Sequence, residues 1–362
     1  MEEAQQYFVY VGTYASSDQP GIYIYRLNEE TGQLGFVDNL AGIDNPSYLA
    51  FDSQQRHIYA VSETRHYKGQ QGGSVVAIAR DQATGTLQKL NQRPTLGEEP
   101  CYISVTPGDE MLLAVNYTGG SFCAYDLLQD GTIGEQIDFI QKTGKGLRTD
   151  RQEGPHPHSI VLDPSGKHVL IADLGLDKIC AYQLDLKAKK YVEQHEIAVE
   201  PGTGPRHSVF SANGHYAYII NELASSITVF AYDSTTAQLH ARQTISTLPI
   251  EYKDSAKNTS ADIHLSPDGR FLYGSNRGHD SIVVYRIEQE SGMLTLVQHV
   301  STVGKTPRNF AITPGGRLML VANQATDSVV VFKRDVATGT LEPTGDQLEM
   351  PKPVCIKICA VR

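Results

Sequence analysis

Two closely spaced histidines are the first residues in this sequence whose types and spacing suggest chemistry. The stretch GPHPHS at 154–159 places His156 and His158 among prolines, which restrict the local backbone. An imidazole can accept or donate a proton near neutral pH, so a rigidly held pair favours a functional site over a solvated loop. Whether the two rings share a site depends on which other side chains the fold brings to them.

Further ionisable side chains occur in similar short motifs later in the chain. Arg206 and His207 stand in GPRH, Glu222 in NEL, Arg277 in SNRG and Arg308 in TPRN. A carboxylate or an imidazole can act as a general base, and guanidinium groups can hold an anion or stabilise a developing oxyanion. This set of groups suits the cleavage or formation of an ester-type bond in an anionic substrate.

These motifs belong to an internal repeat that begins at a proline and ends at an asparagine. The same number of residues separates the two ends of the motif in five units: Pro100–Asn116, Pro157–Asp173, Pro205–Asn221, Ser260–Asn276 and Pro307–Asn323. In a sixth unit we align Pro46 with Glu63, and these two residues lie one position further apart than the others. Each unit continues into a second alternating run, such as SITVFAYD, and a turn such as ATGTL. This pattern predicts four short strands joined by hairpins, and a period of about fifty residues is typical of a propeller blade.

The two ends of the chain supply the parts of one more unit. Residues 7–34 carry the later strands of a unit without its first strand, and the terminal KPVCIKICAVR carries only such a first strand. Joining the ends would hide sheet edges that could otherwise pair with other molecules. We therefore predict an all-β fold: a seven-bladed β-propeller of four-stranded antiparallel blades, closed by the C-terminal strand pairing with the N-terminal blade, as a single domain over residues 1–362.

Two positions in each unit are expected to face the same end of the central channel, which we call the mouth. The first mouth position follows the proline and is occupied by Ser47, Cys101, His158, Arg206, Ala261, Arg308 and Val354. The second mouth position follows the asparagine and is occupied, in this alignment, by Tyr14, Thr64, Tyr117, Leu174, Glu222, Arg277 and Gln324. Ionisable side chains occupy these positions only in the later units, so we expect five of them to converge on one side of the mouth: His158, Arg206, Glu222, Arg277 and Arg308.

Each of these residues also has a structural interpretation. A histidine at the start of a strand can be a buried hydrogen-bond donor, and an arginine and a glutamate in adjacent blades can form an ion pair that only supports the fold. The recurring asparagines are expected to bond the backbone of turns. We expect His156 and His207, which flank the cluster, to help bind substrate. A loop before GPHPHS could extend a positive rim through Lys145, Arg148 and Arg151.

Composition argues against several classes of protein. A net charge of -10 argues against a nucleic-acid partner, and no run of about 18 apolar residues suggests a membrane span. The acidic N-terminus is unlike a signal peptide, so a cytoplasmic protein is expected, as a monomer or weak homo-oligomer. Among the five cysteines, Cys355 and Cys359 would lie roughly 13 Å apart along one strand, too far for a disulfide. No cofactor-binding motif and no metal-ligand spacing occurs within one segment, so we expect no cofactor and no bound metal. A metal site assembled from residues of several blades is still compatible with the sequence.

Several motifs together carry a resemblance to a known family. They are VGTYASSDQPGIYIYRL, NPSYLA, GPHPHS, IADLGLDKICAY, GPRH, NEL, SPDGRFLYGSNRG and TPRNF, and the likeness extends from about residue 7 to residue 359. In this combination the sequence resembles the bacterial lactonase family of seven-bladed propellers, which includes propeller-type 6-phosphogluconolactonases. A fungal carboxymuconate-lactonizing cycloisomerase is related to that family.

The resemblance implies an enzyme that hydrolyses a sugar lactone without a metal, with 6-phosphogluconolactone as substrate and 6-phosphogluconate as product in the pentose phosphate route. It implies that the catalytic residues are His158, Glu222, Arg206 and Arg277. From the mouth positions we add Arg308 as a residue that binds the small anionic lactone. In this scheme Arg206 and Arg277 hold the substrate and polarise its carbonyl. Either Glu222 or His158 takes a proton from the attacking water.

Two other functions are compatible with the same sequence. A lactonase or cycloisomerase acting on another anionic lactone or a muconate would also need arginines for a carboxylate, and substrate preference would distinguish it. A non-catalytic propeller used as an interaction scaffold would show a binding patch on one face and an indifferent channel. The concentration of charge expected at the mouth favours an enzyme.

Overall fold

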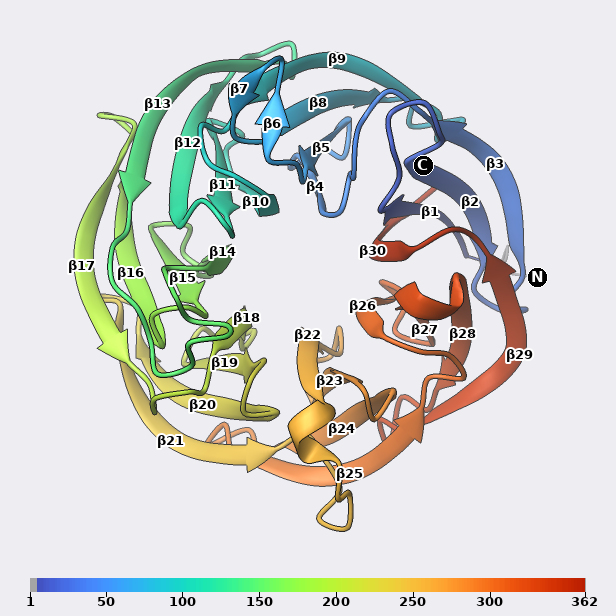
Figure 1. Cartoon of the computed structure of the whole chain (residues 1–362). Coiled ribbons are helices and arrows are strands. Elements are labelled where there is room, and N and C mark those ends of the chain that lie inside the picture. Colours follow the sequence, from blue (N-terminus) through green and yellow to red (C-terminus); the bar gives the residue numbers. More distant parts are fainter. Residues whose placement is uncertain (1–4, 362) are drawn as a thin grey trace.

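Seven four-stranded antiparallel sheets form a closed ring around a central channel (Figure 1). This computed structural model describes residues 5–361 of the chain. The innermost strands of successive blades contact one another all the way around the ring. The predicted all-β, seven-bladed propeller is thereby confirmed.

In six blades the strands run outward from the channel in chain order, and the seventh, which we call the split blade, takes its innermost strand from the C-terminal end. The split blade contains β30 (Pro353–Ala360), β1 (Gln6–Thr13), β2 (Ile22–Asn28) and β3 (Leu34–Leu40). Blade 1 contains β4 (Leu49–Phe51), β5 (His57–Ser62), β8 (Ser74–Arg80) and β9 (Leu87–Pro94). Blade 2 contains β10 (Pro100–Val105), β11 (Met111–Asn116), β12 (Ser121–Leu127) and β13 (Ile133–Gln141). Blade 3 contains β14 (Pro157–Leu162), β15 (His168–Asp173), β16 (Lys178–Asp185) and β17 (Lys190–Ala198).

The remaining three blades follow the same plan. Blade 4 contains β18 (Pro205–Phe210), β19 (Tyr216–Asn221), β20 (Ser226–Asp233) and β21 (Gln238–Ser246). Blade 5 contains β22 (Thr259–Leu265), β23 (Phe271–Arg277), β24 (Ser281–Ile287) and β25 (Leu294–Ser301). Blade 6 contains β26 (Pro307–Ile312), β27 (Leu318–Asn323), β28 (Ser328–Arg334) and β29 (Leu341–Glu349). The connections hold the hairpin of β6 (His66–Tyr67) and β7 (Gln70–Gln71) and two short 3-10 helices, η1 (Ser255–Lys257) and η2 (Gln324–Thr326).

The ring closes where the two ends of the chain pair, as predicted. Strand β30 lies antiparallel to β1, with Tyr7 opposite Ala360 and Gly12 opposite Cys355. Because β2 pairs with the other side of β1, neither edge of β1 is left open. The side chain of Asn309 in blade 6 also accepts a hydrogen bond from the Ile356 backbone N–H, at 2.6 Å, which ties the last blade to the split one.

The core lies between neighbouring blades rather than in one central mass. One apolar cluster, for example, joins Tyr218 and Val229 of blade 4 to Leu272 and Tyr285 of blade 5. Inner strands such as β19 are therefore buried on both faces, whereas the outer strand β21 alternates toward solvent. All five cysteines are buried and, within residues 5–361, none forms a disulfide, in agreement with the spacing of Cys355 and Cys359.

A repeated hydrogen bond latches one blade to the next. A tyrosine of the second strand donates its hydroxyl to a glycine carbonyl in the outer hairpin of the following blade. The pairs are Tyr10–Gly85 at 2.9 Å, Tyr59–Gly131 at 3.0 Å, Tyr218–Gly292 at 3.1 Å and Tyr273–Gly339 at 2.8 Å. Gly85 has a φ of 80°, and a Cβ there would lie 2.4 Å from the Phe8 ring, so both conformation and space require glycine.

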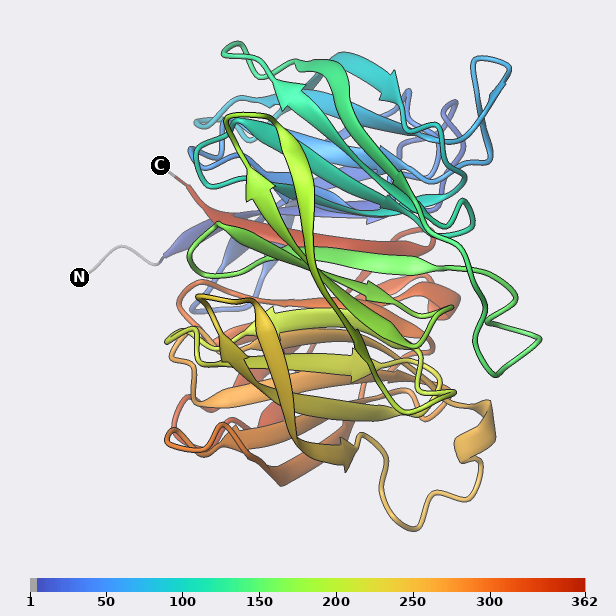
Figure 2. The same ribbon diagram turned by 90° about the vertical axis from the view of Figure 1, so that its left-hand side faces the viewer.

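Long connections gather at one end of the propeller, and the chain termini lie at the other (Figure 2). The projecting segments are the β6–β7 hairpin, the loop 142–156 between β13 and β14, and the segment 247–258 that contains η1. This is the mouth end, because each innermost strand begins there. Across residues 5–361, neither of the two short helices has the length and apolar character that crossing a membrane requires.

Closing the ring should contribute strongly to stability. We expect Ile356→Ala to lower the free energy of unfolding by about 2–5 kcal/mol, because the side chain is 2% exposed and packs between the split blade and blade 6. Val336→Ala, at a side chain that is 41% exposed in a turn, should change it by less than about 0.5 kcal/mol. Urea unfolding followed by circular dichroism measures both, and equal midpoints for the two variants would contradict the proposed importance of closure.

Candidate active site

A β-bulge places the first mouth position in most blades. In blade 3, Pro157 pairs with Asp173 and Ser159 pairs with Ala172, which leaves His158 as an extra residue. The same shift occurs after Pro100, Pro205 and Pro307. Bulges re-aim side chains and are frequent near active sites. The side chains of His158, Arg206 and Arg308 therefore leave the faces of the blades and line one small cavity at the mouth.

A backbone hydrogen bond fixes the second mouth position. The N–H of Glu222 donates to the Gly204 carbonyl at 2.7 Å, and that of Tyr117 donates to Glu99 at 2.9 Å. In blade 1 the residue that makes this bond is Glu63, which donates to Asn45 at 3.1 Å.

The predicted alignment of blade 1 was wrong by one position. Ser62 pairs with Ser74 just as Asn116 pairs with Ser121, so Ser62, which keeps the constant spacing from Pro46, takes the place of the asparagine. Glu63, not Thr64, therefore occupies the second mouth position. The expectation that ionisable residues occupy mouth positions only in the later blades is also wrong. The constant spacing from the proline, applied to Pro46, would have identified Glu63 as a mouth residue.

The Glu222 carboxylate is the centre of a buried ion cluster. It accepts a hydrogen bond from Arg206 Nε at 2.9 Å and lies 2.9 Å from Arg277 Nη2. A third guanidinium, that of Arg151 from the loop 142–156, bonds its other oxygen. Glu222 is 3% exposed and Arg206 2% exposed. Three of the residues predicted for the site are thus in direct contact, and a fourth joins them from a loop outside the repeat.

Charge, rather than burial, sets the protonation state of Glu222. Burial alone would raise the pKa of this carboxyl group, but Arg277, Arg206, His158 and Arg151 together hold it well below its usual value. Glu222 is therefore ionised at neutral pH and neutralises only part of the positive charge around it. The remaining positive charge suits an anionic ligand.

His158 is buried in an environment that keeps it neutral. Burial and, next, the nearby Arg206 lower the pKa of its imidazole well below 6.5. The ring packs edge-on against Tyr117 and His207, with centroids 5.2 and 5.3 Å away, and its Nδ1 lies 3.7 Å from Cys101 Sγ. A neutral imidazole in this position can accept a proton.

His207 lines the same cavity and is held by a carboxylate on its far side. Its Nδ1 lies 2.8 Å from Asp262 Oδ1, so we assign the proton to Nδ1. The other nitrogen, Nε2, is then free to accept from Arg206 Nη1 at 3.1 Å. Burial lowers the pKa of His207 to about 3, which agrees with this neutral form. Asp262 also bonds His264 at 2.8 Å and thereby anchors the whole arrangement.

Arg308 differs from the other mouth arginines in that no carboxylate bonds it. Within residues 5–361 its guanidinium makes no hydrogen bond or ion pair and instead lies over the Tyr14 ring, 5.4 Å from the centroid. Glu63, on the same side of the mouth, accepts hydrogen bonds from the hydroxyl groups of Tyr14 and Ser47. Because the N–H groups of Arg308 are not used within the described residues, they are available to an anionic group.

His156 and most of the basic loop residues lie away from this cavity. His156 stacks on Tyr117 with ring centroids 4.5 Å apart, and its nitrogens face the Tyr117 carbonyl at 2.9 Å and Glu153 at 3.2 Å. Arg148 pairs with Asp150 instead, and Lys145 is exposed.

The recurring asparagines make structural contacts. Asn323 donates to the Thr302 carbonyl at 3.0 Å, and Asp173 accepts from the His156 N–H at 2.8 Å. Across residues 5–361, no group of three or more histidine, cysteine, aspartate or glutamate side chains is arranged to hold a metal ion.

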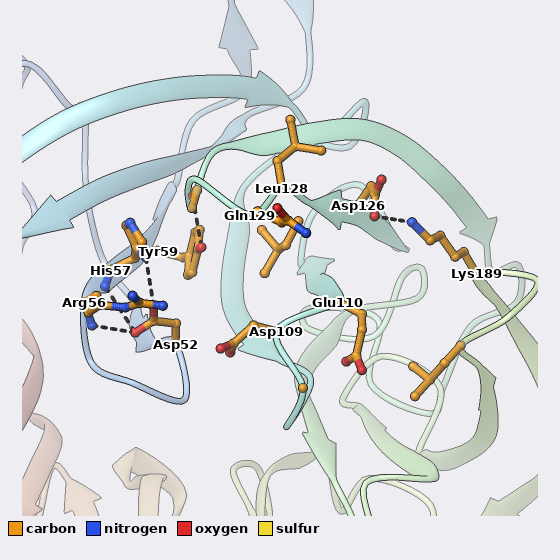
Figure 3. A pocket seen from close by; sticks show the side chains of 14 residues that line it. Asp52, Arg56, His57, Tyr59, Asp109, Glu110, Asp126, Leu128, Gln129 and Lys189 are labelled. Atoms are coloured by element: carbon orange, nitrogen blue, oxygen red, sulfur yellow. Dashed lines mark hydrogen bonds and ion pairs between the residues drawn. The ribbon is translucent and has the colours of Figure 1, made fainter.

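A wider pocket of about 430 Å³ lies at the other end of the propeller, between hairpins of blades 1, 2 and 3 (Figure 3). Most of its charged groups are already paired with one another or with turns. His57 bonds Asp52 at 2.8 Å, Lys189 pairs with Asp126, and Asp109 accepts from Ser53. None of the residues predicted to do chemistry lines it. We therefore take the mouth cluster as the candidate active site.

Removing the central carboxylate should destabilise the protein. We expect Glu222→Gln to lower the free energy of unfolding by about 3–5 kcal/mol at pH 7, because buried guanidinium groups would lose their counterion. Since the folded pKa of Glu222 is depressed, its contribution is present above the unfolded value of 4.5 and is lost as the pH falls through the lower folded pKa. Urea titrations at several pH values test this, with Glu98→Gln, at a glutamate that accepts a hydrogen bond from Gln71, as control. A difference that stays constant down to pH 2 would refute the assignment.

Comparison with known proteins places this geometry in a family. The model of the lactonase family of seven-bladed β-propellers matches residues 8–358. A 6-phosphogluconolactonase of Bacillus subtilis is 34% identical over 97% of this chain and 98% of its own length, and one of Formosa agariphila is 34% identical over 94% and 96%. The crystal structure of a periplasmic gluconolactonase from Pseudomonas aeruginosa is 33% identical, covers 99% of this chain and 100% of that one, and superposes with a TM-score of 0.91. The chain belongs to the seven-bladed β-propeller lactonase family.

Proposed function

We propose that this protein hydrolyses a sugar lactone, with 6-phosphogluconolactone as substrate and 6-phosphogluconate as product. The observation that carries the proposal is the ion cluster at the mouth, where a neutral His158 lies beside the arginines that surround Glu222. Membership of the lactonase family and the names of the relatives from Bacillus subtilis and Formosa agariphila support the choice of substrate.

Substrate binding is assigned to the arginines. Arg308, which no carboxylate bonds within the described residues, receives the phosphate group of the lactone. Arg206 and Arg277 hold the ester carbonyl and stabilise the negative charge that develops on its oxygen. Both are positioned before substrate arrives, because Glu222 and the carbonyls of Ala261 and Ser260 hold them. Preorganised donors of this kind lower the barrier most.

Proton transfer is assigned to His158. Its imidazole takes a proton from a water molecule as the water oxygen bonds to the lactone carbonyl carbon. The ring C–O bond then breaks, and the imidazolium returns the proton to the departing alkoxide, so the histidine ends neutral. Glu222 is the weaker candidate for this base because arginines already bond both of its oxygens. Its role is to hold those arginines in place.

The reaction would serve the pentose phosphate route in the cytoplasm. The relatives named as 6-phosphogluconolactonases support this place in metabolism. The five cysteines are buried and, in the part of the chain that the structure describes, form no disulfide, which agrees with a reducing compartment.

Lactone opening tests the proposal directly. Freshly generated 6-phosphoglucono-1,5-lactone, coupled to an NADP-linked 6-phosphogluconate dehydrogenase, should be hydrolysed well above the no-enzyme rate. We expect Arg277→Ala to lower kcat/KM by about 10²–10³, because a preorganised donor to the carbonyl oxygen is lost. Arg270→Ala, in a turn at the far end of the propeller, is the matched control and should leave the rate unchanged. A wild-type rate no faster than buffer would reject the proposed function.

The pH dependence should report a neutral His158. With an unphosphorylated lactone, which has no group titrating in this range, we expect kcat/KM to be constant from pH 6 to 8. The proton-accepting form is lost only as the pH falls through the lowered pKa, because burial, Arg206, His207 and Arg308 disfavour the cation and outweigh Glu222. Cys101 and Tyr117, which also face the ring, have raised pKa values and stay neutral over this range. Initial rates corrected for spontaneous opening measure this, and a midpoint near 6.5 would contradict it.

A further inference from the structure

The mouth contains a second carboxylate, Glu63, whose surroundings differ from those of Glu222. The two occupy equivalent positions in blades 1 and 4, which two other blades separate along the ring. Glu222 is bonded by three arginines, whereas Glu63 is bonded by hydroxyl groups and, within residues 5–361, forms no ion pair. One side of the mouth therefore holds a carboxylate bonded by arginines, and the other holds a carboxylate bonded by hydroxyl groups.

Glu63 has acceptor capacity left over. A carboxylate can accept about four hydrogen bonds, and Tyr14 and Ser47 each have a single hydroxyl proton to donate. The Glu63 side chain lines the same cavity as His158, Arg206 and Arg308. That cavity has a volume of about 10 Å³, room for one water-sized group, and so forms the floor on which a larger ligand would rest.

We propose that Glu63 is a specificity residue that accepts hydrogen bonds from ring hydroxyl groups of the lactone. The inference rests on the proposed function and adds to it the reason why a sugar lactone is preferred. A carboxylate favours a hydroxyl donor, so Glu63 selects polyhydroxylated lactones over lactones of the same ring size that lack hydroxyl groups. Burial raises the pKa of Glu63, and the positive charge of Arg308, which lines the same cavity, opposes that shift.

Two uncharged lactones of the same ring size test this role without involving the phosphate site. Glucono-1,5-lactone carries the hydroxyl groups, and δ-valerolactone lacks them. Hydrolysis of either releases an acid, so one pH-stat assay measures both after subtraction of spontaneous opening. We expect Glu63→Gln to lower kcat/KM for glucono-1,5-lactone by about tenfold, mainly through KM, since a hydrogen bond to a charged acceptor is weakened. The rate with δ-valerolactone should stay within about twofold.

The controls separate this role from folding and from the proposed function. Glu98→Gln, at a half-buried glutamate that accepts a hydrogen bond from Gln71 on a mouth loop, should change neither rate. Glu63→Asp keeps the charge but moves the carboxylate back by one methylene, so we expect an intermediate loss of kcat/KM for glucono-1,5-lactone. This variant also tests the role of Glu63 if Glu63→Gln fails to fold. An unchanged preference between the two lactones, or an equal fall for both, would overturn the role of Glu63 while leaving lactonase activity intact. A wild-type protein that opens no lactone would instead reject the proposed function, and this inference with it.

Discussion

A propeller depends on closing its ring, because each blade buries its two faces only against its neighbours. Here the closing contact is the pairing of β1 with β30, which joins the two ends of the described chain in one sheet. The mouth requires this closure, since Tyr14, which follows β1, lies beneath the Arg308 guanidinium, and Val354, near the start of β30, lines the mouth cavity with Arg308 and Asn309 of the last complete blade. The hydrogen bonds from tyrosine hydroxyl groups to glycine carbonyls likewise join neighbouring blades at other junctions. The site is therefore a property of the whole ring rather than of any one blade.

The repeat explains why so much of the fold could be predicted from the sequence. The constant spacing between the proline and the asparagine sets the pairing of the first two strands, and five units keep it with recognisable residues at both ends. The prediction failed in blade 1 because Ser62 stands where the others have asparagine or aspartate, so Glu63 was aligned one place too early. In blade 1 the residue types at the end of the motif led to a wrong alignment, although the pairing register of the strands is the same as in the other blades.

Loops outside the repeat were harder to predict for a different reason. The loop 142–156 has no counterpart in other blades, so nothing in the sequence indicated that Arg151 would fold back onto Glu222 while Arg148 would not. The result is a strongly cationic spot in a protein whose net charge is -10. The single carboxylate of Glu222 holds these arginines in place but neutralises only part of their charge, so they still attract an anion. The net charge of the whole protein does not reveal such a local excess.

The β-bulge at the first mouth position separates the choice of side chain there from the pairing of the strands. A bulged residue is not part of the strand ladder, and the bulges that follow a proline in blades 2, 3, 4 and 6 carry Cys101, His158, Arg206 and Arg308 with the same pairing pattern around them. The register of the two strands is therefore the same whichever side chain the bulge presents. New ligand preferences can arise in this architecture by single substitutions at such bulges, with the strand pairing of the blades left as it is.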